Sequence, residues 1–379
     1  MAKRGKIPRI YLLIGAFTLL LIVSIVFLFL VFKKEDALKG ADQAIRLSAQ
    51  GGFNCEYAEA QKLYAFGEGV LKVTEDRIAY LTLSGNEVFS TGVSYRNPQC
   101  HNTVNTAVVF DLDGYAFTLL TPEGIRFSTP TDNKIKSAIL SDSGSLVAII
   151  TESENESAYG DVHIYDNDGN RIAYFTSSDS GYPISGVFSH DESFFALTTL
   201  NTVGAVPAPY IRMFALSSTG AGTTVSDYGV YTTDSDDIFG PVVYAGNRLY
   251  TFSTNKIYTI ENDSLVTLGN EYGVINQVTA VNDVVFVVYA DGVEQMNKIA
   301  VIDTSGQTIY SSAVGSELNA VASNEERYAL SIDRRIYVFN RNGSVIADIS
   351  VDEEVLRMGF IANNKLIIIS TGGVHTIDY

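Results

Sequence analysis

Closely spaced carboxylates are the first residues in this chain that could do chemistry, because they could bind a divalent cation. Asp166, Asp168 and Asn170 alternate in YDNDGNR, as ligands do at the start of a calcium loop. A loop of the EF-hand type carries a bidentate Glu at position 12, where this sequence has Ser177, so that loop is excluded. The same turn recurs as TSGQ and RNGS without the carboxylates. A β-hairpin turn is therefore the favoured interpretation.

The other candidate side chains lack the spacing of a metal or catalytic site. Asp234, Asp236 and Asp237 form the densest acidic loop, TTDSDDIFG, for which a solvated loop is favoured over a cation site. The sequence has no G-x-S-x-G, H-E-x-x-H or P-loop motif, and its glycines are spread over turns. We expect no metal, no cofactor and no catalytic residue that a motif identifies. The four histidines lie in different repeats without zinc-ligand spacing, and they are His101, His163, His190 and His375.

Cys55 and Cys100 are the only cysteines of the chain. An oxidising compartment would permit one bridge between them. Two cysteines are too few for a disulfide scaffold or a zinc ribbon. A Cys55–Cys100 disulfide and two free thiols are equally open from the sequence.

Most of the chain consists of short strand-like segments separated by polar turns. Turns rich in Asp, Asn, Ser and Gly recur from TEDR (74–77) to ANNK (362–365), each followed by an apolar strand such as SLVAII or LIIIS. Their mean spacing is about 41 residues, which is the period of a four-stranded propeller blade. A blade cannot bury both faces alone, so blades must pack side by side around a channel. The sequence predicts an all-β protein, a β-propeller of eight four-stranded blades, with seven blades as the alternative.

The two ends of the repeat region predict how the ring closes. The last unit supplies only three strands before Tyr379, and residues 62–67 read as a lone strand before the first unit. We expect this N-terminal strand to pair with the C-terminal blade, because closure removes exposed strand edges. The propeller domain is then expected over residues 61–379.

Long loops indicate where such a ring could bind a partner. The loops 151–161, 200–210 and 290–298, between second and third strands, are longer than the rest, as are the blade-joining segments 94–103 and 231–240. We expect them on one face of the ring, biased to blades three and four, with neutral drift in loop length as the alternative. The residues expected to form this partner-binding face are Glu152, Glu154, Tyr159, Val206, Pro207, Pro209, Tyr210, Asp234 and Asp237.

Residues 10–32 form an unbroken run of apolar or small residues. At about 1.5 Å per residue, a helix of this length spans the bilayer core of roughly 30 Å. The run is too long for the apolar region of a signal peptide and lacks a small-residue cleavage site, so we expect an uncleaved transmembrane helix. Residues 1–9 are then a cytoplasmic tail and residues 33–60 a juxtamembrane linker.

Charge sets the orientation and limits the partners. The Lys and Arg counts on the two sides of the span tie, but a short basic tail before an anchor helix usually stays in the cytoplasm, which puts the C-terminal domain outside the cell. The formal net charge is −17, and the first nine residues are basic, so the acidic excess lies in the C-terminal part. This balance argues against nucleic acid and against lipid headgroups as partners, beyond the bilayer that holds residues 10–32.

The whole chain resembles an uncharacterised family of single-pass, membrane-anchored proteins from Gram-positive bacteria, known only as a domain of unknown function. The resemblance rests on the N-terminal anchor, on GFNCEYAEAQKLYAFGEGVLKV, and on the units SDSGSLVAII and DVHIYDNDGNRIAYF. The repeats are also similar to the WD-repeat and quinoprotein-like propellers, without the Trp-Asp and Gly-His signature of the former or the Trp-docking motif of the latter. The family has no known catalytic residues that could be transferred.

These observations favour a membrane-anchored extracytoplasmic propeller that binds a protein, a peptide or an envelope glycan without catalysis. The alternative is an enzyme with its active site in the propeller channel, of the quinone-dependent dehydrogenase or lyase type. Loop residues scattered over several blades could form such a site without any sequence motif, so the absence of motifs does not decide between the two.

Overall fold

The computed structural model describes residues 44–379, except 156, 180, 220–221, 234–236, 270, 292–295 and 363. The predicted tail 1–9, the predicted transmembrane helix 10–32 and the first part of the predicted linker lie outside the described residues. Within the described part of the chain, no helix combines the length and the hydropathy of a membrane span.

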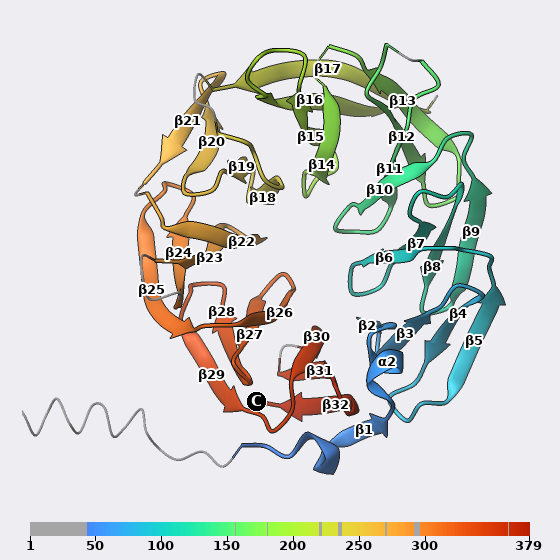
Figure 1. Ribbon diagram of the computed structural model, residues 1–379, viewed down its shortest axis with the longest axis vertical. Coiled ribbons are helices and arrows are strands. Elements are labelled where there is room, and N and C mark those ends of the chain that lie inside the picture. Colours follow the sequence, from blue (N-terminus) through green and yellow to red (C-terminus); the bar gives the residue numbers. More distant parts are fainter. Residues whose placement is uncertain are drawn as a thin grey trace, which may run out of the picture. The chain divides into compact units, whose positions relative to one another are not determined.

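The described residues from Ile45 to Tyr379 form eight antiparallel sheets of four strands, which surround a common centre as blades (Figure 1). The prediction of an all-β propeller with eight four-stranded blades is confirmed, and the alternative of seven blades is wrong. In blades 1 to 7, the strand order within the sheet follows the order in the sequence, from the centre outwards.

Blade 1 comprises β2 (Leu63–Phe66), β3 (Gly69–Val73), β4 (Arg77–Leu81) and β5 (Glu87–Gly92), and blade 2 comprises β6 (Pro98–Asn102), β7 (Ala107–Asp111), β8 (Ala116–Thr121) and β9 (Gly124–Pro130). Blade 3 comprises β10 (Ile135–Leu140), β11 (Leu146–Thr151), β12 (Gly160–Asp166) and β13 (Arg171–Ser177), and blade 4 comprises β14 (Tyr182–Phe188), β15 (Phe194–Asn201), β16 (Ala208–Thr219) and β17 (Gly222–Thr232). Blades 5 to 7 comprise β18 (Val243–Ala245), β19 (Arg248–Phe252), β20 (Ile257–Glu261), β21 (Ser264–Leu268); β22 (Val274–Val281), β23 (Val284–Ala290), β24 (Asn297–Asp303), β25 (Thr308–Gly315); and β26 (Leu318–Ser323), β27 (Arg327–Ile332), β28 (Arg335–Asn340), β29 (Val345–Ser350). Blade 8 comprises β30 (Val355–Ala362), β31 (Lys365–Ser370), β32 (Gly373–Asp378) and, from the N-terminal side, β1 (Gly51–Asn54). The short helices η1 (Leu47–Ala49) and α2 (Tyr57–Ala60) flank β1.

The position of a strand within its blade explains its composition. Second strands such as β7, β11 and β31 are almost continuously buried, because neighbouring blades cover both of their faces. Fourth strands such as β5 and β9 alternate between half-buried and exposed residues, because they form the outer rim. The continuous apolar runs of the sequence therefore mark strands inside the blades, and the Ser- and Thr-rich segments mark strands on the outer rim.

The core is divided among the interfaces between blades. The described residues form eight apolar clusters, and each cluster combines side chains from two adjacent blades. One example lies between blades 6 and 7, where Phe286 of β23 stacks on Tyr328 of β27 at a ring-centroid distance of 4.3 Å. No blade has a core of its own among these clusters, which is why the blades need one another.

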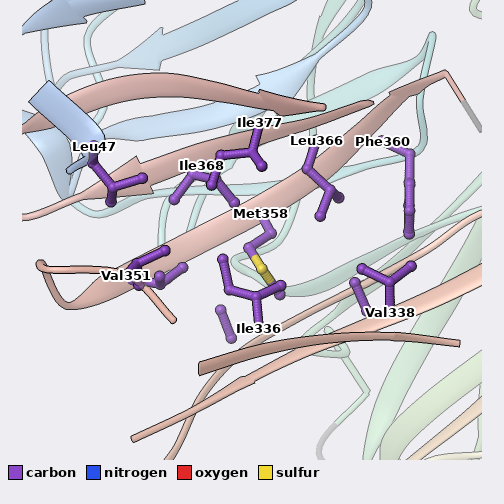
Figure 2. Packing of buried hydrophobic residues seen from close by; sticks show 12 residues of the cluster. Leu47, Ile336, Val338, Val351, Met358, Phe360, Leu366, Ile368 and Ile377 are labelled. Carbon is purple, nitrogen blue, oxygen red and sulfur yellow. The ribbon is translucent and has the colours of Figure 1, made fainter. Parts of the chain in front are cut away.

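The N-terminal segment closes the ring. β1 pairs antiparallel with β32, with Gly52 opposite His375 and Phe53 opposite Val374. Before β1, Ile45 forms a parallel bridge with Val351, and Leu47 is fully buried in the cluster between blades 7 and 8. Figure 2 shows Leu47 beside Ile368, Met358 and Val351 in this cluster.

The predicted closing strand was wrong, although the predicted type of closure is present. Residues 62–67 do form a strand, β2, but β2 pairs with β3 as the innermost strand of blade 1. The strand that completes the C-terminal blade is β1, inside the segment 33–60 that was expected to be a linker. The propeller therefore begins before residue 61.

The error has a physical cause in the similarity of the turns. TEDR (74–77) and DLDG (111–114) connect second to third strands, whereas the later turns of the predicted series connect first to second strands. Asp, Asn, Ser and Gly satisfy the backbone equally well in both kinds of turn. The blade boundaries in the first two units were consequently shifted by one strand.

Candidate functional site

The topology gathers the long loops on one face of the ring. Four antiparallel strands return the chain to the face from which each blade starts, so the connections between blades and the loops between second and third strands share that face. We call it the loop face; its long loops are residues 152–159, 202–207, 233–242 and 291–296. Residues 94–103, expected to be a blade-joining loop, instead contain the inner strand β6.

Loop 152–159 exposes two of the predicted residues, Glu152 and Glu154. Glu152 is exposed and forms an ion pair of 2.7 Å with Lys136, whose ammonium also contacts Asp113 at 2.7 Å. These two carboxylates raise the pKa of Lys136. Glu154 is exposed at the same loop.

Tyr159 connects this loop to blade 4. Its ring lies 4.8 Å from the ring of Tyr182 in an edge-to-face arrangement, and its backbone N–H donates to the carbonyl of Ser177. Such aromatic pairs contribute beyond their buried area. Tyr159 is half-buried, and its ring partner Tyr182 is exposed.

Loop 202–207 exposes apolar side chains, but it is shorter than predicted. Val206 and Pro207 are exposed, as expected. Pro209 and Tyr210 were expected in the loop and instead belong to β16, where Pro209 is buried and Tyr210 half-buried. The cause is the length of β16, which extends to pair Pro209 with Leu200 of β15.

Of the predicted acidic residues in loop 233–242, Asp234 lies outside the described residues. Asp237 is half-buried and accepts hydrogen bonds from the hydroxyl of Tyr258 and, at 3.4 Å, from the ammonium of Lys256. Its carboxylate therefore ties the loop to β20 and supplies less free negative charge than the sequence indicated.

The structure adds exposed apolar residues to the loop face that the sequence analysis missed. Three of them lie inside the long loops that the sequence identified without being singled out there, and the other two lie at the first residues of β14 and β22. Their exposed fractions range from 41% for Met296 to 75% for Val203. Together with Val206, these residues are Tyr182, Val203, Ile238, Val274 and Met296.

The turn containing Asp166, Asp168 and Asn170 is a hairpin turn, as the sequence favoured. Oδ1 of Asp166 accepts from the backbone N–H groups of Asp168 at 3.0 Å and Asn170 at 2.8 Å. Asp303 and Asn340 play the same part in the TSGQ and RNGS turns. Within the described ranges, no group of three or more His, Cys, Asp and Glu residues could hold a metal ion.

The histidines occupy separate blades, and burial lowers the pKa of three of them, His101, His163 and His375. His190 differs, because its imidazole pairs with the carboxylate of Asp142 on the neighbouring blade, which raises its pKa. Folding therefore favours the neutral form of three imidazoles and the charged form of His190.

Cys55 and Cys100 are free thiols in this structure. Cys55 follows β1 and packs into the cluster between blades 8 and 1, whereas Cys100 lies on β6 in blade 2. Of the two arrangements left open by the sequence, the structure has the unbridged one. Burial raises the pKa of the Cys100 thiol to about 12, so this thiol is not poised as a nucleophile.

A cavity of about 530 Å³ lies between the innermost strands β2, β6, β22, β26 and β30. Among the described residues that line it, Arg357 carries the only permanent charge, and none is Asp or Glu. His101 faces this cavity and accepts a hydrogen bond at Nδ1 from the backbone N–H of Leu140 at 3.3 Å.

Comparison with known proteins assigns the chain to a family. Residues 46–378 match the family of unknown function DUF5711, which includes β1 and the three other strands of blade 8. The chain belongs to this family. No curated protein matches the sequence.

Several solved structures share the fold. AztD from Citrobacter koseri is 10% identical with a TM-score of 0.54, covering 84% of this chain and 89% of that one. BamB from Moraxella catarrhalis is 13% identical with a TM-score of 0.52, covering 87% and 99%. A structure described as the eukaryotic initiation factor is 14% identical with a TM-score of 0.52, covering 86% and 83%. At these identities the likeness shows a shared propeller fold.

Proposed function

We propose that this protein is a membrane-anchored extracytoplasmic module that binds a protein, peptide or other envelope component through its loop face. Residues 10–32 anchor it in the membrane, with residues 1–9 in the cytoplasm. The observation that carries the binding proposal is the set of exposed apolar side chains on the loop face of blades 4 to 6, including Val203, Val206 and Ile238. Exposed apolar residues that are gathered on one face of a protein are typical of interaction surfaces.

The surroundings of these residues indicate the chemistry of the partner. Glu154 is exposed in the loop of blade 3 on the same face, and the whole chain is strongly acidic. A partner segment with apolar side chains and Lys or Arg residues would complement this surface. The rigid ring supports the loops without having to reorganise, which lowers the entropic cost of binding.

The binding proposal can be tested by cross-linking in intact cells, followed by affinity capture of the full-length chain. The triple variant Val203→Ser, Val206→Ser, Ile238→Ser should lose the partners that the wild type captures. The matched control is Val88→Ser, Val230→Ser, Val345→Ser, which removes exposed valines from fourth strands on the outer rim. Capture of the same partners by both triple variants would contradict the proposal.

The proposed orientation has its own test. Protease added to intact cells should digest the C-terminal domain and leave a fragment that contains residues 1–32. A domain that stays intact until the cells are lysed would place it on the cytoplasmic side and overturn the localisation, while leaving the loop-face test unaffected.

A further inference from the structure

Arg357 gives the central cavity an unusual charge for this protein. The cavity is lined by the innermost strands of blades 8, 1, 2, 6 and 7. The chain carries a formal net charge of −17, yet the one permanent charge among the described lining residues is a cation. Field lines are concentrated in a channel with low-dielectric walls, so this single charge acts strongly on a ligand inside it.

The contacts of Arg357 fix its guanidinium at the seam between blades 8 and 1. Its central carbon lies 4.4 Å from the centre of the Tyr64 ring, and Nη1 donates to the carbonyl oxygens of Gln61 at 2.9 Å and Leu63 at 3.4 Å. Among the described residues, no carboxylate forms an ion pair with Arg357, and no protein acceptor engages Nε or Nη2. A guanidinium has five N–H donors, so the donors that remain can bind an anion in a defined direction.

The groups around Arg357 are neutral. Burial raises the pKa of Tyr64 and of the nearby Cys100 thiol, and burial lowers the pKa of His101, so none of them offsets or adds to the charge of Arg357 near pH 7. The remaining wall combines amides such as Asn319 with apolar side chains such as Phe66 and Met358. The cavity therefore offers one positive charge beside a wall that combines polar groups with apolar side chains.

We propose that the central cavity binds a small organic anion, with its carboxylate on Arg357 and its apolar body against the inner strands. The volume of about 530 Å³ lies within the range of small-molecule sites. Tyr64 stacks on the guanidinium and holds it in place for bidentate contact with the carboxylate. This site is distinct from the loop face, and neither proposal depends on the other.

The test uses 4-fluorobenzoate as the probe, observed by ¹⁹F NMR with the full-length protein in a nonionic detergent. 4-Fluorobenzyl alcohol is its uncharged counterpart. We expect saturable binding of 4-fluorobenzoate that the variant Arg357→Met weakens about ten- to a hundredfold, as expected for loss of a charge-assisted contact. The matched control Arg126→Met removes the same charge from an exposed position on β9 and should leave binding unchanged.

Three results of this binding experiment would overturn the proposal. They are the absence of saturable binding by the wild type, equal binding by the two Arg variants, and binding of the alcohol as tight as that of the carboxylate. Arg357 also joins two blades, so Arg357→Met could fail to fold. A competition experiment on the wild type therefore tests the site without this variant. Unlabelled benzoate should displace the probe from the wild type and benzamide should not; equal displacement by both would likewise refute the anion site.

Discussion

At the scale of single residues, the closing strand pair depends on one glycine. Gly52 has a φ of +134°, and a Cβ there would lie 1.9 Å from the carbonyl oxygen of Val374 on β32. Any larger residue would strain the backbone and push β1 away from its partner strand. The seam therefore tolerates only glycine at this position.

We predict that Gly52→Ala lowers the free energy of unfolding by at least about 2 kcal/mol, measured by urea denaturation. Gly92→Ala is the control, because its Cβ would have no neighbour closer than 3.9 Å and no unusual φ is required. That variant should stay within about 0.5 kcal/mol of the wild type. Equal stability of the two variants would contradict this prediction, because it would mean that β1 and β32 accommodate a Cβ at position 52 without loss of stability.

The sequence predicted where the residues of the candidate site lie better than it predicted their burial and their hydrogen-bond partners. Loop length alone led to Glu152, Val206 and Pro207, all of which are exposed on the loop face. The state of Asp237 depends on Tyr258 and Lys256, which become its neighbours only in the folded blade. No local pattern in the sequence contains that information.

At the scale of elements, the segment that contains η1 and β1 completes the ring. We predict that a chain beginning at Glu56 is less stable than one beginning at Ile45 by about 3 kcal/mol or more, since burial of Leu47 alone accounts for roughly 2–5 kcal/mol. The loss also exposes the edge of β32, which can then pair with another molecule. Thermal denaturation and size-exclusion chromatography would measure the two effects.

A point variant separates the contribution of the buried Leu47 side chain to stability from that of strand β1. Leu47→Ala in the longer chain keeps β1 and should show the lower stability without the association of molecules. A chain from Glu56 that melts at the same temperature as the longer one would mean that β1 is dispensable.

The elements themselves were largely predictable, whereas their grouping was not. Alternating and continuous apolar runs identified the strands, because burial on one or both faces leaves different periodicities. The assignment of strands to blades depends on whether a turn joins the first to the second strand or the second to the third, and residues such as Asp111 and Asn282 suit either kind of turn. The strand β1 was missed since GGFN offers little apolar pattern, and its place is determined by the vacant edge of β32.

At the scale of the whole molecule, the free energy of unfolding of the ring should decrease as the pH falls from neutral to mildly acidic. A histidine whose pKa is lowered by folding binds its proton more weakly in the folded state, so stability falls as the pH drops through its unfolded value of about 6.5. His101, His163 and His375 act in this direction. His190 opposes them, because its raised pKa adds stability that is present at low pH and lost as the pH rises.

We predict that the urea midpoint falls between pH 7.5 and pH 5.5, and that His190→Gln makes this fall steeper by removing the opposing group. The comparison of the two slopes isolates His190 from the carboxylates, which titrate at lower pH. A wild-type midpoint that is flat or rises toward pH 5.5 would contradict the balance of three buried imidazoles against one.

The position of the closing pair has a consequence for biosynthesis. β1 leaves the ribosome near the beginning of the folded part, and β32 leaves it last, so the first strand of blade 8 is separated from the other three by the synthesis of seven complete blades. A nascent chain that ends before β32 leaves β1 without its partner strand. Completion of the ring thus distinguishes finished molecules from prematurely terminated ones, and cellular proteases that recognise frayed ends can remove the latter.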